Sequence, residues 1–186
     1  MRLGGIHIAF IAAAILLSAC HRTAPQSPSR RSSDGTKVDT TVLSLMEINQ
    51  RMAIHADREL LRIVDSVREA DHVDFAQMSC GGWKMRRDSV TREKSLYEDS
   101  PRPNEKWRVH IQSYDLQGHM LMDTEKVYAI KHFDMPLAVE EAVEDMFAGE
   151  KTVVYAPWYT AFGLNGDDHI KPYTNIRFVV TLKEKE

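Results

Sequence analysis

Residues 146–163 read Met-Phe-Ala-Gly-Glu-Lys-Thr-Val-Val-Tyr-Ala-Pro-Trp-Tyr-Thr-Ala-Phe-Gly, and residues 170–182 read Ile-Lys-Pro-Tyr-Thr-Asn-Ile-Arg-Phe-Val-Val-Thr-Leu. The glycine at 149 predicts the end of a helix. Residues 152–156 and 176–182 are β-branched and aromatic, with apolar residues at every second position of the second run, which predicts two strands. Pro157 begins a loop between them. These two stretches decide the fold because they predict a helix, a strand, a loop and a last strand in that order.

Residues further upstream predict more strands. Trp107, Val109 and Ile111 alternate with polar residues over 107–114, which is typical of a strand with one buried face. Gln117-Gly118 predicts a turn into a returning strand at 119–122. Residues 75–87 read as extended, with a bulge or bend at the glycine pair 81–82.

The short helix is predicted between these strands and the closing stretch. We expect Asp134 to cap it, Pro136 to lie in its first turn and Gly149 to end it. Antiparallel strands wrapped around one short helix make an α+β fold.

A long amphipathic helix is predicted over residues 42–70. Its apolar residues recur at spacings of three and four: Leu45, Ile48, Met52, Ala56, Leu60, Ile63, Val64 and Val67. The helix can pack along the domain or form a dimer seam. The stripe is wider than a strict coiled-coil seam and includes alanines, so we expect packing along the domain and a monomer.

The N-terminus predicts a location. Arg2 precedes an apolar run over residues 6–17 that is short for a membrane span and typical of a secretion signal. The run ends in Leu17-Ser18-Ala19-Cys20, which resembles the bacterial lipobox, in which the cysteine is lipidated. The alternative is an ordinary signal peptide with an incidental cysteine. Acylation would tether the chain to the cell envelope, facing the periplasm or the surface.

Composition and charge exclude several function classes. The net charge of −3 without a clustered basic face argues against nucleic-acid binding. Cys80 is the only cysteine after Cys20, so no internal disulfide is expected, and Cys80 should be buried as a small hydrophobe. Asp167, Asp168 and the histidines lie on separate elements without metal-ligand spacing, so we expect no metal and no cofactor. Those histidines are His110, His119, His132 and His169.

The closing stretches resemble FKBP-type prolyl isomerases. In that family a helix ending Met-x-x-Gly-[Glu/Gln]-[Lys/Arg] leads into a strand, then Pro-x-x-x-Ala-Tyr-Gly, then Ile-Pro-Pro-x-Thr-Pro-Leu-x-Phe. The residues in register are Met146, Gly149, Lys151, Pro157, Ala161, Gly163, Ile170, Pro172, Thr174 and Phe178. Residues 109–118 and 137–143 resemble the family's hairpin and helix segments, so the resemblance covers about 103–186, with 75–88 as the first strand.

The layout is closest to the gliding-motility-associated FKBP-like lipoproteins of Bacteroidetes. These share a lipobox, a helical N-terminal extension and a Tyr-Asp-Leu-x-Gly hairpin, here residues 114–118. The resemblance implies four parts: a lipoprotein signal at 1–19, a flexible tether at 20–40, a helical extension at 41–72 and an FKBP-like domain at 75–186.

The resemblance also implies site residues. Phe178 matches the aromatic at the base of the pocket, and Ile170 matches the residue whose backbone N–H bonds the substrate carbonyl. Phe162 stands where the family has a tyrosine whose hydroxyl bonds the substrate. Val139 stands at the floor tryptophan and Ile111 at the tyrosine wall. For Phe178, Ile111 and Val139, core packing is the alternative reading.

Asp123 falls near the family's Phe-Asp pair. It matches that carboxylate only if the hairpin carries one extra residue, and the alternative is a solvated turn residue.

Two functions follow from the resemblance. The first is a prolyl cis-trans isomerase, lipid-anchored at Cys20, that assists folding of proline-containing proteins in the cell envelope. The second is a non-catalytic binding module or chaperone, including a part of a gliding or secretion apparatus that docks through the helix at 42–70. The altered residues at Ile111, Val139 and Phe162 favour the second.

Overall fold

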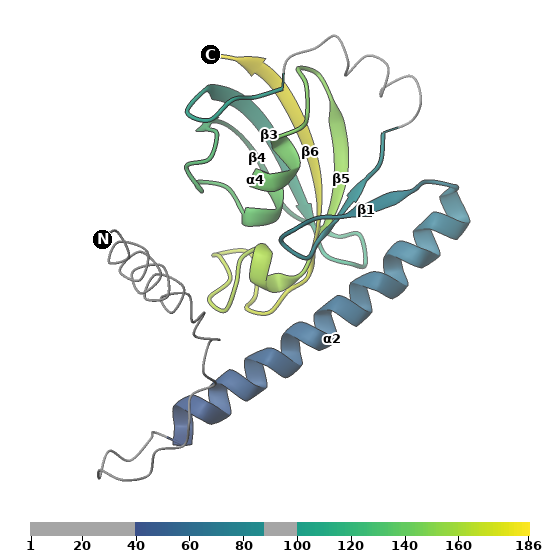
Figure 1. Cartoon of the computed structure of the whole chain (residues 1–186), viewed down its shortest axis with the longest axis vertical. Helices are drawn as coiled ribbons and strands as arrows, with labels where there is room; N and C mark the ends of the chain where they lie inside the picture. Colours follow the sequence, from purple (N-terminus) through teal and green to yellow (C-terminus); the bar gives the residue numbers. More distant parts are fainter. Residues whose placement is uncertain (1–39, 88–99) are drawn as a thin grey trace, which may run out of the picture. The chain divides into compact units, whose positions relative to one another are not determined.

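The sheet has six antiparallel strands in the order β1-β2-β5-β6-β3-β4 (Figure 1). The computed structural model describes residues 40–87 and 100–186, with side chains from Ser44 onward. The strands are β1 (Phe75–Gln77), β2 (Trp83–Met85), β3 (Lys106–Tyr114), β4 (Met120–Ala129), β5 (Lys151–Ala156) and β6 (Ile176–Lys185). The helices are α2 (Thr40–Asp71), α4 (Leu137–Val143) and the 3-10 turn η1 (Trp158–Thr160). The predictions for residues 1–39 lie outside the described residues.

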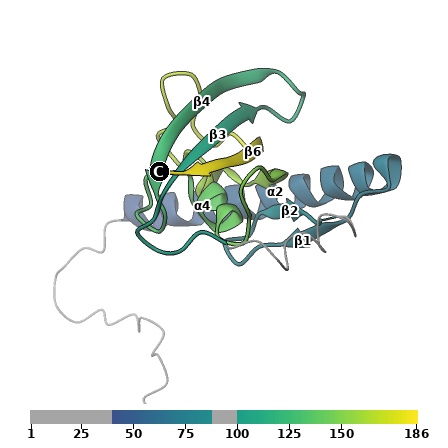
Figure 2. The same cartoon turned by 90° about the horizontal axis from the view of Figure 1, so that it is seen from above.

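Strand β6 organises the core. It pairs with β5 on one side and β3 on the other, so that Phe178 lies opposite Val154 and Ser113. Its alternating residues are buried, as expected for a strand with one face on a core. The short helix α4 packs its alanines and valines against that face, and Figure 2 shows α4 below β3 and β6. The α+β prediction, with a sheet around a short helix, is confirmed.

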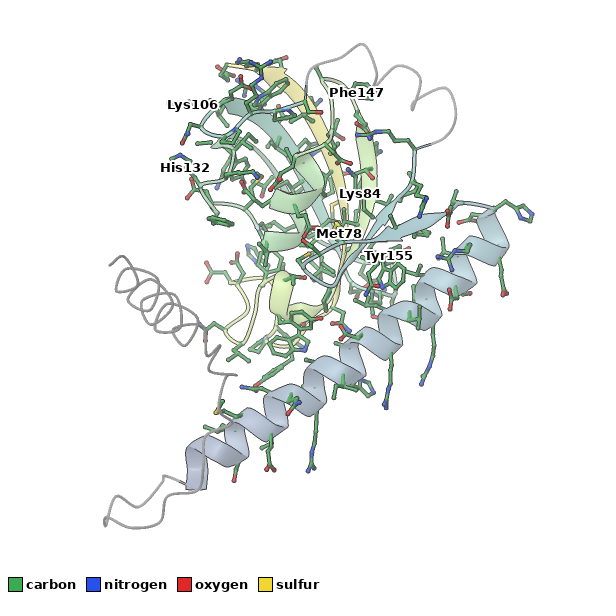
Figure 3. All side chains as sticks on the ribbon, viewed as in Figure 1. Met78, Lys84, Lys106, His132, Phe147 and Tyr155 are labelled. Atoms are coloured by element: carbon green, nitrogen blue, oxygen red, sulfur yellow. The ribbon has the colours of Figure 1, made fainter. Side chains whose placement is uncertain are left out.

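The long helix α2 extends two residues beyond the predicted start and one beyond the predicted end. Leu60 and Val64 are fully buried against Phe75 and Tyr155. The rings of Phe75 and Tyr155 meet edge to face with centroids 5.6 Å apart, and Figure 3 labels Tyr155 beside α2. The chain from Thr41 to Glu186 forms one compact unit. The second half of α2 therefore packs along the sheet as predicted, whereas Leu45, Ile48 and Met52 of the predicted apolar stripe are exposed.

Residues 75–87 form a hairpin instead of one extended segment. Strand β1 pairs with β2 from Phe75↔Met85 to Gln77↔Trp83. Gly81 has a φ of 101°, and a Cβ at this position would lie 2.8 Å from the Tyr159 hydroxyl. Of the predicted bulge or bend at the glycine pair, the structure has a bend that closes the hairpin, because only glycine fits the backbone and the close approach at Gly81.

The start of α4 also differs from the prediction. Its N-cap is Pro136, and no side chain caps it. The Pro136 carbonyl accepts the N–H groups of Val139 and Glu140 at 2.8 and 2.9 Å. The prediction that Asp134 caps this helix is wrong, because the helix begins two residues later than a cap at Asp134 requires.

The end of α4 differs as well. The helix ends at Val143, and Gly149 follows six residues later with a φ of 81°. Gly149 lies in the turn from Phe147 to Glu150 that enters β5, and its N–H donates to the Leu182 carbonyl at 2.7 Å. The positive φ explains the glycine, but it serves a turn at the sheet edge and not the helix.

Within residues 40–87 and 100–186, we find no helix with the length and apolar character needed to cross a membrane. The same residues hold no group of three metal-ligating side chains.

Candidate apolar site between the short helix and the sheet

Five of the six predicted site residues gather between α4 and the sheet. Ile111 comes from β3, Val139 from α4, Phe178 from β6, and Ile170 and Phe162 from the loop between β5 and β6. The rings of Phe162 and Phe178 lie 6.0 Å apart at a tilt of 44°. The structure thus brings residues from four separate segments into one apolar cluster.

Packing fills this cluster. Phe178 and Val139 are 0% exposed, and Ile111 and Ile170 are 2% exposed. Such residues behave as close-packed core, whatever else they do. Phe162 is only partly buried, so it lies at the edge where the cluster reaches solvent.

Three surface pockets of the described chain lie elsewhere. One of about 410 Å³ runs along β2 and the end of α4, beside Lys84, Arg87 and Asp145. Two smaller ones, of about 160 and 190 Å³, lie against α2. Their lining residues include none of the five clustered residues, and Phe162 is the one of the five that solvent reaches.

The backbone N–H of Ile170 is already engaged. It donates to the Asp167 carbonyl at 3.0 Å, and the Asp167 N–H donates back to the Ile170 carbonyl at 2.8 Å. Gly166, with a φ of 67°, folds the loop back so tightly that a Cβ there would clash with the Ile170 carbonyl oxygen. This turn occupies the Ile170 N–H, so a substrate carbonyl would have to replace the Asp167 carbonyl as its acceptor, and the predicted role of Ile170 stays a prediction.

Asp123 lies outside the cluster. It is exposed on β4, where its carboxylate accepts from the Gln112 amide at 3.0 Å and lies 2.6 Å from His110 Nε2. The hydrogen bonds from Gln112 and His110 hold the pKa of Asp123 below its usual value. Gln112 and His110 alternate with the buried residues of β3, so all three polar side chains share the outer face. The structure therefore does not bring Asp123 together with the other five predicted site residues.

The hairpin does carry the extra residue that Asp123 would need. Ser113 pairs with Met122, but Tyr114 pairs with Met120, so Leu121 is an additional residue in β4. The bulge turns Leu121 toward the core cluster. The hairpin thus meets the condition set for Asp123, but Asp123 pairs with Gln112 and faces outward with it.

Ser113 is a residue that we did not predict for the site. It is fully buried, pairs directly with Phe178, and its hydroxyl has no hydrogen-bond partner among the described atoms. A buried hydroxyl without a partner costs about 1–3 kcal/mol. The signal in the sequence is a polar residue at an apolar position of the β3 alternation. Ser113 offers the cluster a donor for a ligand carbonyl.

Two glutamates of α4 were also missed. Glu141 accepts from the Ser79 N–H at 2.6 Å, the Ser79 hydroxyl at 2.9 Å and the Cys80 N–H at 2.9 Å. Burial alone would raise the pKa of Glu141, but the hydrogen bonds from Cys80 and Ser79 outweigh it and lower the pKa. Figure 3 labels Met78 at this turn of the β1–β2 hairpin, beside α4. Glu141 thereby fastens the hairpin to the helix that carries Val139.

The neighbouring Glu140 is buried under the loop that follows β4. One oxygen accepts the Lys131 N–H, and the other has no partner among the described atoms. Burial has the largest effect and raises the pKa of Glu140, while the hydrogen bond from the Lys131 N–H lowers it. Burial likewise raises the pKa of Cys80 to about 11, which keeps its thiol protonated.

Comparison with known proteins agrees with the fold. No protein-family model matches the chain, and no curated protein matches it. Among solved structures, a peptidyl-prolyl cis-trans isomerase (PPIase) from Pseudomonas syringae pv. tomato str. DC3000 matches with a TM-score of 0.52. The match has 16% sequence identity and covers 72% of this chain and 96% of that chain. At this identity the likeness concerns the fold, and the chain has the FKBP-like α+β fold that its closing stretches predict.

Proposed function

We propose that this protein is a peptidyl-prolyl cis-trans isomerase. The observation that carries the proposal is Phe162, which is partly exposed and lies tilted against the buried Phe178 with ring centroids 6.0 Å apart, in a fold like that of a solved isomerase. Rotation about an X–Pro bond faces a barrier of about 20 kcal/mol, because the amide loses its double-bond character on the way. The reaction needs no nucleophile. It needs an apolar surface that grips the pyrrolidine ring and a donor for the twisted amide.

The clustered residues can supply both. A prolyl ring enters where Phe162 reaches solvent and packs against Phe178, which excludes water from the amide. The Ser113 hydroxyl, opposite Phe178 and without a partner among the described atoms, donates to the carbonyl that precedes the proline. Because the cluster is packed, the Phe162 side chain rotates aside to admit the prolyl ring and then closes over it, while the loop backbone keeps its place.

The first prediction tests this site. In a proline-tetrapeptide assay, residues 21–186 should accelerate isomerisation above the uncatalysed rate, since they retain the compact unit from Thr41 onward. Phe162→Ala should lower kcat/KM about tenfold or more, because it removes the ring that closes over the substrate. Leu164→Ala, in the same loop at 47% exposure, is the matched control and should leave kcat/KM unchanged.

A rate equal to background from the folded wild-type chain would refute the isomerase proposal. Equal losses in Phe162→Ala and Leu164→Ala would instead refute the place of the site within the loop.

A second candidate function is a non-catalytic binding module or chaperone. The packed cluster and the engaged Ile170 N–H favour it, because both leave fewer groups to act on a twisted amide. It requires that unfolded, proline-containing protein binds while the tetrapeptide is not turned over. Turnover that Phe162→Ala abolishes, with binding intact, would exclude it. Membership of a gliding or secretion apparatus, docked through α2, would fail if deleting the helix left complex assembly normal.

We further propose that Cys20 is lipidated and tethers the protein in the cell envelope, where its clients would be. The four residues ending at Cys20 support this, because they match the lipobox. Wild-type chain expressed in bacteria should incorporate labelled palmitate and sediment with membranes, and Cys20→Ser should do neither. Cys80→Ser, the only other cysteine change, should keep the label. Label that persists in Cys20→Ser would contradict the anchor.

A further inference from the structure

Three side-chain hydrogen bonds connect α2 to the loop at 157–175. The Tyr159 hydroxyl donates to Asp57 at 2.6 Å, and the Asn175 amide donates to Glu59 at 2.7 Å. The Tyr173 hydroxyl donates to Asn49 at 2.8 Å. All three cross more than a hundred positions of the sequence. They are therefore tertiary contacts between a helix and one particular loop.

Helical geometry explains how α2 reaches both ends of that loop. At about 100° per residue, Asn49 and the buried Leu60 point in nearly the same direction. Asp57 and Glu59 lie about 80° to either side of Asn49. The carboxylates of Asp57 and Glu59 thus lie on the two sides of the helix face that is buried. Each of them binds a residue at a different end of the loop.

Asn175 joins the two ends of the loop to each other as well as to the helix. It is 8% exposed, and its carbonyl oxygen accepts the Trp158 N–H at 3.0 Å. A carboxylate only accepts, so Glu59 requires that the amide nitrogen of Asn175 face the helix. The amide oxygen then necessarily faces Trp158. Glu59 therefore fixes the orientation that closes the loop.

A cluster of three aromatic rings, those of Trp158, Tyr159 and Tyr173, also connects the loop at 157–175 to α2. Trp158 meets the ring of Tyr159 at 5.5 Å and 89°, and the ring of Tyr173 at 4.8 Å and 61°. Both tyrosine hydroxyls reach α2. Burial, followed by the hydrogen bond to Asp57, raises the pKa of Tyr159, so its hydroxyl stays protonated and donates.

Phe162 and Ile170 lie between these tethered ends. The Gly163 N–H donates to the Trp158 carbonyl at 2.8 Å, and the Tyr173 N–H donates to the Gly163 carbonyl at 3.3 Å. These bonds join Gly163, the residue after Phe162, to the backbone of Trp158 and of Tyr173. The helix α2 holds the side chain of Tyr173 and that of Tyr159, the residue next to Trp158. A shift of Tyr159 or Tyr173 therefore moves the segment that carries Phe162.

We propose that Asn49, Asp57 and Glu59 of α2 are positioning residues that hold the 157–175 loop in the conformation in which Phe162 closes over the apolar cluster. This inference rests on the proposed function, because it assigns a role toward that site. The helix touches none of the substrate's atoms. It sets substrate affinity through the fraction of molecules whose loop is competent to bind, since apparent affinity scales with that fraction.

The test uses the full chain in detergent and the double variant Asp57→Ala/Glu59→Ala. Amide hydrogen exchange over 162–173 should become about tenfold faster, because each lost bond involved a charged acceptor. Exchange in β5 and β6 should match the wild type. KM for a proline peptide should rise by a similar factor with kcat nearly unchanged.

Two control variants make the test specific. Asp57→Asn/Glu59→Gln keeps the acceptor oxygens and should restore both the exchange rates and KM. Glu47→Ala, an exposed carboxylate on the same helix, should change neither. Amide variants that behave like the alanine variants would overturn the proposal.

Two further results would also overturn it: unchanged loop exchange in the double variant, or faster loop exchange with an unchanged KM. If the wild-type chain shows no turnover, the isomerase proposal fails separately. Loop exchange and the Kd of a fluorescent proline peptide then decide the positioning role in the same way, and a wild-type chain that binds no such peptide overturns it.

Discussion

Replacing Phe178 with alanine is expected to destabilise the protein by about 3–5 kcal/mol. Phe178 is 0% exposed on the central strand, and the cavity left by its ring could not collapse between β3, β5 and α4. The loss should appear as a lower urea midpoint at an unchanged m-value. It also means that lost activity in this variant cannot be assigned to the pocket without a measure of folding.

The matched control is Phe133→Ala, since Phe133 is 70% exposed in the loop before α4. This variant should change the free energy of unfolding by about 0.5 kcal/mol or less. A cost below about 1 kcal/mol for Phe178→Ala would show that the ring lines an open pocket and is not part of the packed core.

Leu60→Ala should cost about 2–5 kcal/mol, whereas Leu61→Ala on the next position should cost about 0.5 kcal/mol or less. Leu60 is 0% exposed against Phe75 and Tyr155, and Leu61 is 42% exposed. Both changes have the same effect on helix propensity, so the difference between them reports packing alone. Urea unfolding followed by circular dichroism measures it.

The comparison decides whether α2 is part of the folded unit or an appendage. Equal and small effects of the two substitutions would contradict the packing of α2 on the sheet. A large effect of Leu60→Ala on the sheet signal itself, and not only on the helix signal, is the expected sign of one cooperative unit.

Local patterns predicted the elements well where one face is buried. The alternation through Val109 and Ile111 predicted β3, and the apolar spacing through Leu60 and Val64 predicted α2. Both patterns follow from burial of one face, which neighbouring residues along the chain encode directly. The capping of α4 was predicted wrongly, because aspartate and glycine suit caps and several kinds of turn alike, and the neighbouring chain decides which of these forms at Asp134 and Gly149.

The candidate site was predicted only in part, and the misses have one physical cause. Asp123 faces outward because the bulge at Leu121 sets the alternation of β4, and bulges have no local signature in this strand. The Ile170 N–H is engaged because a glycine turn folds the loop onto itself. The direction of Asp123 and the engagement of the Ile170 N–H both depend on backbone hydrogen bonds, which the identity of a single residue does not reveal.

By itself, the sequence determined which segments are strands and helices and which of their faces turn inward, because hydrophobic periodicity acts locally. It also placed Ile111, Val139, Phe162 and Phe178 in one cluster through a resemblance of motif and spacing. Only the tertiary structure decided how tightly that cluster is filled, that Ser113 faces it, and that α2 holds the loop that carries Phe162. Those properties arise from contacts between residues as far apart in the sequence as Asn49 and Tyr173. Close packing and hydrogen bonds between distant segments form only once the chain has folded and those segments meet.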